Sequence, residues 1–152
     1  MELSQKLTAC LKVEMLCEEI YYSLCNLFPE AKELFRQLAE EEERHADILT
    51  ISTGFHKIDA LPDKIVPDSP GRILESLHLA EKMKRTLEED ELFLREVLQM
   101  ALELEESVAE LYFNELMNEG SDDDVISYLQ KYYKDEMSHV ERIKRYILEI
   151  PS

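Results

Sequence analysis

The sequence predicts an all-α protein, folded as an antiparallel four-helix bundle with a long crossover between its second and third helices. Leu, Glu, Lys, Ala and Met, which are good helix formers, fill most of the chain. Strong turn residues are confined to positions 28–29, 61–71 and 119–121. No stretch alternates apolar and polar residues as a half-buried strand would. We therefore expect a single helical domain over residues 1–152.

The first two helices are expected to form a tight hairpin. Apolar side chains recur every three or four residues along positions 2–27, which predicts an amphipathic helix there. A second helix is expected to begin at Pro29 or Glu30, because proline is tolerated in a first helical turn, and to run to about residue 58. The short junction between the two helices predicts antiparallel packing.

The rest of the chain is expected to form a second hairpin. Residues 61–70 contain three prolines and form the long connection, and a short crossover helix is expected from about Gly71. A third main helix is expected at residues 88–118. Ser121 and the acidic residues that follow it predict the N-terminus of a fourth helix, which should continue to about Ile150, ahead of Pro151. The second hairpin would thus repeat the first.

Charge and cysteine content restrict the class of partner and the compartment. Asp and Glu number 34 against 17 Lys and Arg, so the net charge is -17 and nucleic acid and anionic membranes are excluded as partners, whereas cations are favoured. No apolar stretch is long enough for a membrane span, and no secretory signal is evident. Cys10, Cys17 and Cys25 fall on one expected helix and cannot form a disulfide framework, and their odd number, with the missing signal, indicates a reducing cytoplasm. They form no Cys-x-x-Cys pair that could build a sulfur site for zinc or iron.

One polar pattern occurs in both expected hairpins. A Glu precedes a Tyr by seven residues on one helix, and the next helix carries Glu-x-x-His. Seven residues make nearly two helical turns and three make nearly one, so each pair shares a helix face. The members are Glu14, Tyr21, Glu42 and His45 in the first hairpin, and Glu105, Tyr112, Glu136 and His139 in the second.

These carboxylates and imidazoles lie in line with apolar residues, so the pattern predicts a buried polar cluster. Isolated buried carboxylates are costly, and two divalent cations would balance four of them. Oxygen and imidazole ligands together suit iron or manganese. We expect Glu14 and Glu105 as terminal ligands, Glu42 and Glu136 as bridging ligands, and one histidine on each ion. Two alternatives stay open: core histidines satisfied by neighbouring glutamates, and Glu18 in the place of Glu14.

The segments that carry these residues, at positions 11–22, 38–49, 101–112 and 135–139, resemble the ferritin-like dimetal-carboxylate proteins, and within them the rubrerythrin-like group. The resemblance extends over all four main helices. It implies two iron ions, replaceable by manganese or zinc, and an oxidoreductase that acts on peroxide or oxygen. Separately, the long connection between the two hairpins makes a homodimer the expected assembly.

Two features depart from that family. The rubredoxin-like module with paired Cys-x-x-Cys motifs is missing, so electrons would come from a separate donor protein. The family also has a further Glu near the terminal ligand of the third helix, whereas Val108 stands three residues beyond Glu105. A full peroxidase cycle is less expected for that reason. The alternative function is a non-enzymatic module that stores, buffers or senses metal.

Several neighbouring residues admit more than one role. Tyr21 and Tyr112 could donate hydrogen bonds to glutamates of the opposite hairpin, act as redox-active neighbours of the metals, or simply fill the core. Asp135 is a candidate to orient a histidine ligand. Glu75-x-x-His78 repeats the short motif inside the expected crossover, and we interpret it as coincidental because no matching Glu and Tyr accompany it.

Overall fold

The computed structural model describes residues 1–151, and that part of the chain is helical without strands. The predicted all-α class is therefore confirmed. Two single 3₁₀ turns, Pro29–Ala31 and Asp63–Ile65, lie between longer elements. The α-helices are α1 (Leu3–Leu27), α2 (Lys32–Lys57), α3 (Pro70–Glu89), α4 (Leu94–Glu105), α5 (Val108–Asn118), α6 (Asp124–Gln130) and α7 (His139–Glu149).

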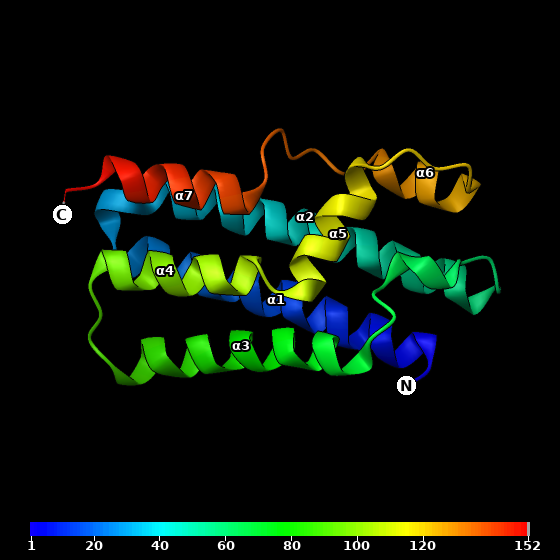
Figure 1. Cartoon of the computed structure of the whole chain (residues 1–152), viewed down its shortest axis with the longest axis horizontal. Coiled ribbons are helices and arrows are strands. Elements are labelled where there is room, and N and C mark those ends of the chain that lie inside the picture. The colour runs from blue at the N-terminus through cyan, green and yellow to red at the C-terminus, as the bar shows by residue number, and fades with distance from the viewer. Residues whose placement is uncertain (152) are drawn as a thin grey trace.

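The α1–α2 hairpin forms as the sequence predicts. Both helices run along the long axis of the molecule and pack against each other over their length (Figure 1). α1 buries Val13, Ile20 and Leu24 against Phe35 and Leu38 of α2, because these apolar residues recur at helical spacing on the facing sides. Pro29 occupies the first position of the 3₁₀ turn that joins the two helices.

The crossover is a full-length helix rather than a short one. α3 has 20 residues and packs along α1 (Figure 1). Its N-terminus is capped by Ser69, whose hydroxyl accepts a hydrogen bond from the Arg72 N–H, and Pro70 follows at the first helical position. Ile73, Ala80 and Met83 are buried on the inner face.

The expected third and fourth helices are both interrupted, so the prediction of two continuous helices there is wrong. α4 ends at Glu105, and α5 begins at Val108 in a different direction (Figure 1). α6 ends at Gln130, residues 131–138 are not α-helical, and α7 begins at His139. Ser138 caps α7 by accepting a hydrogen bond from the Glu141 N–H, which favours a new helix start at this point over continuation from α6. α4 and α7 pack together alongside the first hairpin.

The core consists of two apolar clusters with a polar layer between them. Along α1, Leu7 and Cys10 belong to one cluster, whereas Cys17 and Ile20 belong to the other. Along α2, Leu38 and Ile48 are divided in the same way. The residues between these positions include the expected metal ligands.

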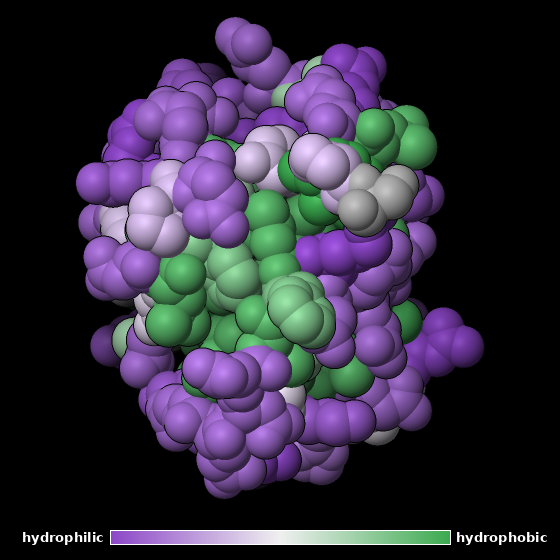
Figure 2. All heavy atoms as spheres, turned by 90° about the vertical axis from the view of Figure 1, so that its left-hand side faces the viewer, coloured by the Kyte–Doolittle hydropathy of each residue, from purple (hydrophilic) through white to green (hydrophobic). Residues whose placement is uncertain are grey.

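Apolar side chains also gather at one end of the bundle, where the α1–α2 and α3–α4 junctions lie (Figure 2). Leu27 and Phe93 are exposed there and line a shallow hollow together with Phe28, Leu87 and Leu92. Within residues 1–151, none of the helices combines the length and the apolar character that a membrane crossing needs.

Candidate metal centre

The α1–α2 hairpin supplies three of the predicted ligands from the middle of its helices. Glu14, Glu42 and His45 are all buried. The His45 Nδ1 atom lies 3.5 Å from Glu14 Oε2 and 3.9 Å from Glu42 Oε2. Glu18, the alternative to Glu14, is only partly buried and lies near the acidic residues Glu43 and Asp47 of α2. The structure thus favours Glu14 over Glu18 as the α1 member of the cluster.

The second half of the chain supplies three further groups from the ends of its helices. Glu105 is the last residue of α4, Glu110 lies in the first turn of α5, and His139 is the first residue of α7. All three are buried. The His139 Nδ1 atom lies 2.8 Å from Glu42 Oε1 and 3.2 Å from Glu105 Oε1. The breaks in the second half therefore bring these side chains to the glutamates of the first.

The six side chains fall into two groups with ligand-like spacing, and a third such group joins both histidines to Asp135. Within each group the candidate ligand atoms all lie within 4.8 Å of one another. Glu42 belongs to both groups, which is the arrangement that a carboxylate shared by two ions requires. One group is Glu14, Glu42, His45 and Glu110; the other is Glu42, Glu105 and His139.

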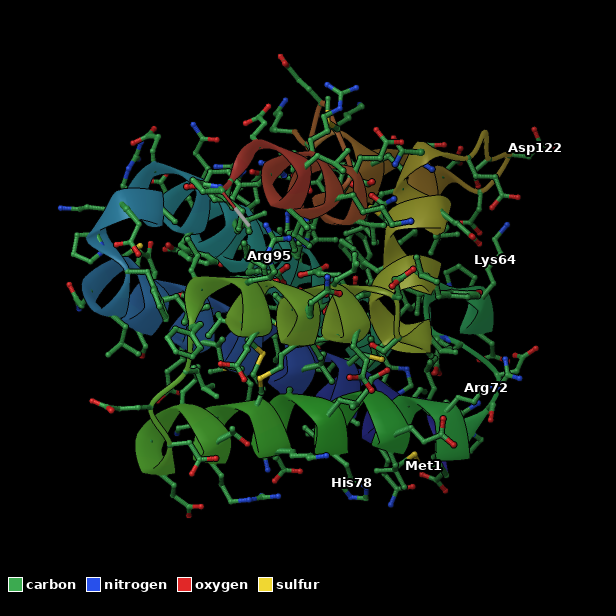
Figure 3. All side chains as sticks on the ribbon, turned by 60° about the vertical axis from the view of Figure 1, so that its left-hand side comes forward. Met1, Lys64, Arg72, His78, Arg95 and Asp122 are labelled. Atoms are coloured by element: carbon green, nitrogen blue, oxygen red, sulfur yellow. The ribbon has the colours of Figure 1, made fainter. Side chains whose placement is uncertain are left out.

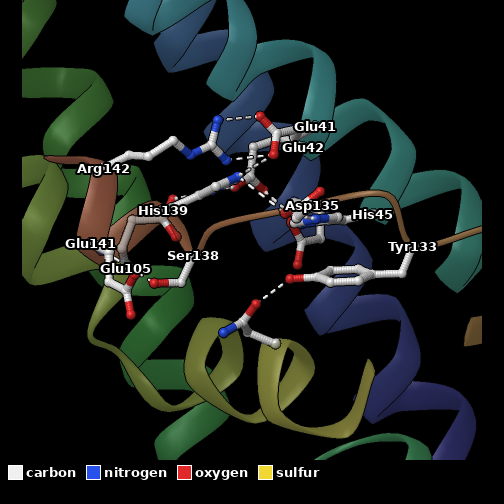
Figure 4. A network of polar contacts seen from close by, with 12 residues as sticks. Glu41, Glu42, His45, Glu105, Tyr133, Asp135, Ser138, His139, Glu141 and Arg142 are labelled. Carbon is white, nitrogen blue, oxygen red and sulfur yellow. Dashed lines mark hydrogen bonds and ion pairs between the residues drawn. The ribbon is translucent and has the colours of Figure 1, made fainter. Parts of the chain in front are cut away.

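Asp135 faces both histidines from the opposite side (Figure 4). Its Oδ2 atom lies 2.8 Å from His45 Nε2 and 3.4 Å from His139 Nε2, and the two rings stack with centroids 5.4 Å apart. Each histidine thus turns Nδ1 toward the glutamates and Nε2 toward the same carboxylate. A carboxylate that accepts the Nε2–H leaves the Nδ1 lone pair free for a cation.

Arg142 and Glu41 form an ion pair beside this cluster (Figure 4). Both terminal nitrogens of the guanidinium donate to the two oxygens of Glu41. Although burial opposes ionisation, contacts with His139 and Arg142 lower the pKa of Glu41 to about 2. Glu41 is buried, as is its neighbour Glu42. Its charge is balanced by Arg142, so Glu41 adds little to the charge excess of the centre.

The shifted pKa values show how strongly this cluster needs positive charge. Burial and the neighbouring carboxylates raise the pKa of Glu42 and of Glu110 well above the ordinary value. Burial alone would lower the pKa of His45, but Asp135 and Glu14 together raise it to about 9. His139 is likewise raised to about 10 against the effect of burial, chiefly by Glu105. Protons therefore supply the charge compensation that cations could supply instead.

Several of the candidate ligand atoms also lack hydrogen-bond partners, which is a second observation that fits a metal site. Glu14 Oε2, Glu42 Oε2 and His45 Nδ1 are buried and accept or donate no hydrogen bond within the described part of the chain. Buried polar atoms normally have partners, because an unpaired one costs about 1–3 kcal/mol. Oxygen and nitrogen atoms that converge without partners are what a cation site requires.

Glu136, which the sequence analysis predicted as a bridging ligand, lies outside the cluster in this structure. It is exposed in the segment 131–138 and belongs to neither group within residues 1–151. α7 begins only at His139, so the helical spacing that would align Glu136 with that histidine does not exist. Glu110 provides the fourth glutamate. Its position in line with buried Phe113 and Met117 was a signal for it in the sequence.

The two predicted tyrosines lie in different surroundings. Tyr21 is fully buried, and its hydroxyl donates a hydrogen bond of 2.7 Å to Glu105 Oε1, which is one of the roles expected for it. Tyr112 instead donates to the backbone carbonyl of Lys64, so it is not a neighbour of the centre. The tyrosine missed by sequence reasoning is Tyr133, whose ring stacks on His45 at a centroid distance of 5.4 Å.

The cysteines and the extra histidine motif lie outside the two groups. The Cys17 Sγ atom is 3.9 Å from Glu110 Oε1, and burial raises its pKa well above the ordinary value. Burial, with Glu14 and Glu110 nearby, raises the pKa of Cys10 to about 12, so both thiols hold their protons. His78 is exposed on the outer side of α3 (Figure 3), as expected for a coincidental motif.

No protein-family model, curated protein or solved structure matches this chain.

Proposed function

We propose that this chain is a dimetal-carboxylate oxidoreductase that binds two iron ions and acts on peroxide or oxygen with electrons from a separate donor protein. The observation that carries the proposal is the burial of four glutamates and two histidines in two groups that share Glu42. Two divalent cations would balance the four carboxylates, and the mixed oxygen and nitrogen donors suit iron or manganese.

The residues divide naturally between the two ions. Glu14, His45 and Glu110 would hold one ion, Glu105 and His139 the other, and Glu42 both. This is the ligand composition of ferritin-like dimetal proteins, with the fourth glutamate taken from α5 instead of from the segment before α7. We propose on this basis that α1, α2, α4 and α7 correspond to a ferritin-like bundle in which the second pair of helices is interrupted.

The protein's own groups would prepare the site for redox chemistry. When bound, two redox-active ions would supply electrons to peroxide or oxygen. Asp135 would accept the Nε2 proton of His45 and so keep its Nδ1 atom available as a ligand, and the same carboxylate oxygen lies 3.4 Å from Nε2 of His139. Tyr21 would donate its hydroxyl hydrogen bond to Glu105 and fix that carboxylate. The two apolar clusters on either side would exclude bulk water.

The test is anaerobic titration with ferrous iron followed by stoichiometric hydrogen peroxide. We expect two ions per chain by elemental analysis after gel filtration, and oxidation of the bound iron faster than that of ferrous iron free in the same buffer. Manganese and zinc should compete for the same two sites. Binding of two ions without accelerated oxidation would remove the oxidoreductase and leave the metal centre. Absence of stoichiometric binding would refute the centre itself.

A metal-storage or metal-sensing module is the second candidate function. The net charge of -17 favours it, because an anionic surface concentrates cations around the protein. The mass of the assembly in solution separates the two proposals. We expect a dimer for the oxidoreductase, whereas a large closed shell would favour storage.

A further inference from the structure

A cavity of about 300 Å³ reaches the cluster at the point where the second half of the chain is interrupted. Its buried lining includes His45, Glu105, Glu110 and His139, so it touches both groups of the proposed centre. It opens between the start of α5 and the junction of segment 131–138 with α7. Two continuous helices would leave no such junction at this level of the bundle.

The outer part of the cavity combines one apolar side chain with polar and charged ones. Leu111 and Asn114 line it from α5, and Glu141 and Lys144 line it from the first turns of α7. Leu111 is 37% exposed, and Glu141 and Lys144 are also exposed, so these residues form the mouth. The cavity therefore runs from exposed side chains to buried candidate ligands.

Asp135 lines the cavity between the mouth and the cluster. Its side chain is only 2% exposed, and its Oδ1 atom has no hydrogen-bond partner among the residues described, although Oδ2 contacts both histidines. A buried carboxylate that lines a cavity and has one oxygen without a partner is suited to contact a passing cation or its water. Six waters occupy about 180 Å³ at ~30 Å³ each, so the cavity is large enough for a hydrated divalent ion.

We propose that this cavity is the entrance through which hydrated divalent metal ions reach the dimetal centre, with Glu141 and Asp135 as successive carboxylate contacts. The inference rests on the proposed function, because it requires that the centre binds metal. It assigns Glu141 to attraction of the ion at the mouth and Asp135 to its transfer inward. Lys144 at the same mouth opposes the approach of cations. The charges of Glu141 and Lys144 at the mouth therefore affect the rate of uptake, whereas the residues that finally bind the ion stay the same.

An entrance and a binding site respond differently to substitution. A change that blocks the route slows uptake and release by the same factor, so the equilibrium affinity does not change. A change to a ligand alters the affinity itself. Kinetics and equilibrium binding measured on the same variant therefore separate the two roles.

The test follows cobalt(II) uptake by stopped-flow absorption and cobalt(II) release into excess EDTA. Leu111→Trp is expected to fill the mouth and to slow both processes at least tenfold, with two ions still bound at equilibrium. Leu148→Trp is the matched control, since Leu148 lies on α7, is 85% exposed and does not line the cavity. We expect it to behave as the unmodified protein.

Two charge variants give a second, independent measurement. Glu141→Gln is expected to slow uptake and Lys144→Gln to accelerate it, each by roughly threefold at low salt and less at high salt. Equal uptake rates in Leu111→Trp and Leu148→Trp would overturn the entrance and leave the metal centre standing. If Leu111→Trp fails to fold, equal rates in the two charge variants would overturn it instead. Failure of the unmodified protein to bind cobalt would overturn both the entrance and the centre.

Discussion

The two halves of the bundle contribute to the candidate centre in different ways. α1 and α2 place Glu14, Glu42 and His45 in the middle of long helices, where backbone hydrogen bonds and two apolar clusters fix them on both sides. In the second half, Glu105 and His139 lie at helix ends, next to interruptions of the backbone. The first half holds its candidate ligands in fixed positions within continuous helices. The candidate ligands of the second half meet them through side-chain contacts, such as that of His139 with Glu42.

The difference shows that similar sequence patterns can be realised by different local structures. In the first half the ligand spacing follows from helix geometry alone. In the second half the interruptions replace Glu136 with Glu110 and introduce Asp135 beside both histidines. They also create the cavity that we propose as the entrance. The preformed half would define the site, and the interrupted half would complete it and control access to it.

The largest effect is expected for Glu42→Gln, because Glu42 is the donor that both halves share. We expect binding of both ions to weaken by more than about 100-fold, beyond the loss typical of residues outside the ligand shell. Burial and the surrounding carboxylates already raise the pKa of Glu42, so its neutral amide replacement should fold normally. Calorimetric titration with cobalt(II) measures the affinity, and exposed Glu43→Gln is the control. Weakened binding of only one of the two ions in Glu42→Gln would contradict the idea that both ions share this ligand.

Asp135→Asn and Glu136→Gln test the interrupted half directly. Loss of the carboxylate that faces both histidines is expected to reduce metal affinity by roughly 10–100-fold while the stoichiometry stays at two. Glu136→Gln should leave the affinity unchanged, since Glu136 is exposed. Both affinities come from competition with a chromophoric chelator. A strong effect of Glu136→Gln, with none from Asp135→Asn, would mean that the segment before α7 is helical when metal is bound.

The pH dependence of stability should differ between the metal-free and metal-loaded protein. Contacts with carboxylates raise the pKa of His45 to about 9 and of His139 to about 10, against an ordinary value of 6.5. A raised pKa in the folded state stabilises the fold below pH 6.5, and this contribution is lost as the pH rises through 9 and 10. The two shifts together correspond to several kcal/mol, and because the two histidines share Asp135 their contributions do not add fully. We therefore expect a combined loss of at least about 2 kcal/mol, or a fall in Tm of at least about 4 °C.

Thermal unfolding followed by circular dichroism between pH 6.5 and pH 10 measures this change. Imidazoles that bind metal carry no proton on Nδ1, so the metal-loaded protein should not show the same decline. Parallel curves for the two forms would indicate that the histidines do not bind the metal.

The smallest effect is expected for Tyr21→Phe, which removes one hydrogen bond between the two halves. The Tyr21 hydroxyl reaches from α1 to Glu105 at the end of α4, and its loss should cost about 1 kcal/mol of stability. Metal affinity should fall a few-fold, because Glu105 is then less well fixed. Tyr112→Phe is the matched control, with its hydroxyl on the Lys64 carbonyl. Urea unfolding and metal titration of both variants distinguish a bridging role for Tyr21 from simple core packing, which would leave metal affinity unaffected.

The sequence by itself determined the helical class, the α1–α2 hairpin and most members of the buried polar cluster. Helical periodicity is a strong signal over 25 residues, and a Glu or His in line with apolar residues must turn toward the core. Glu14, Glu42 and His45 were predictable for this reason. Glu105 and His139 were too, because each retains an apolar helical face on one side of its interruption.

Only the tertiary structure decided where the second pair of helices is interrupted. A serine cap contributes about 1 kcal/mol to the free energy of a helix that restarts at it. Packing against neighbouring elements easily outweighs this difference in free energy. Once α7 begins at His139, Glu136 loses its alignment, Asp135 reaches both histidines, and Glu110 takes the place of the missing carboxylate. Local periodicity cannot predict such exchanges, because they depend on how separate segments pack in space.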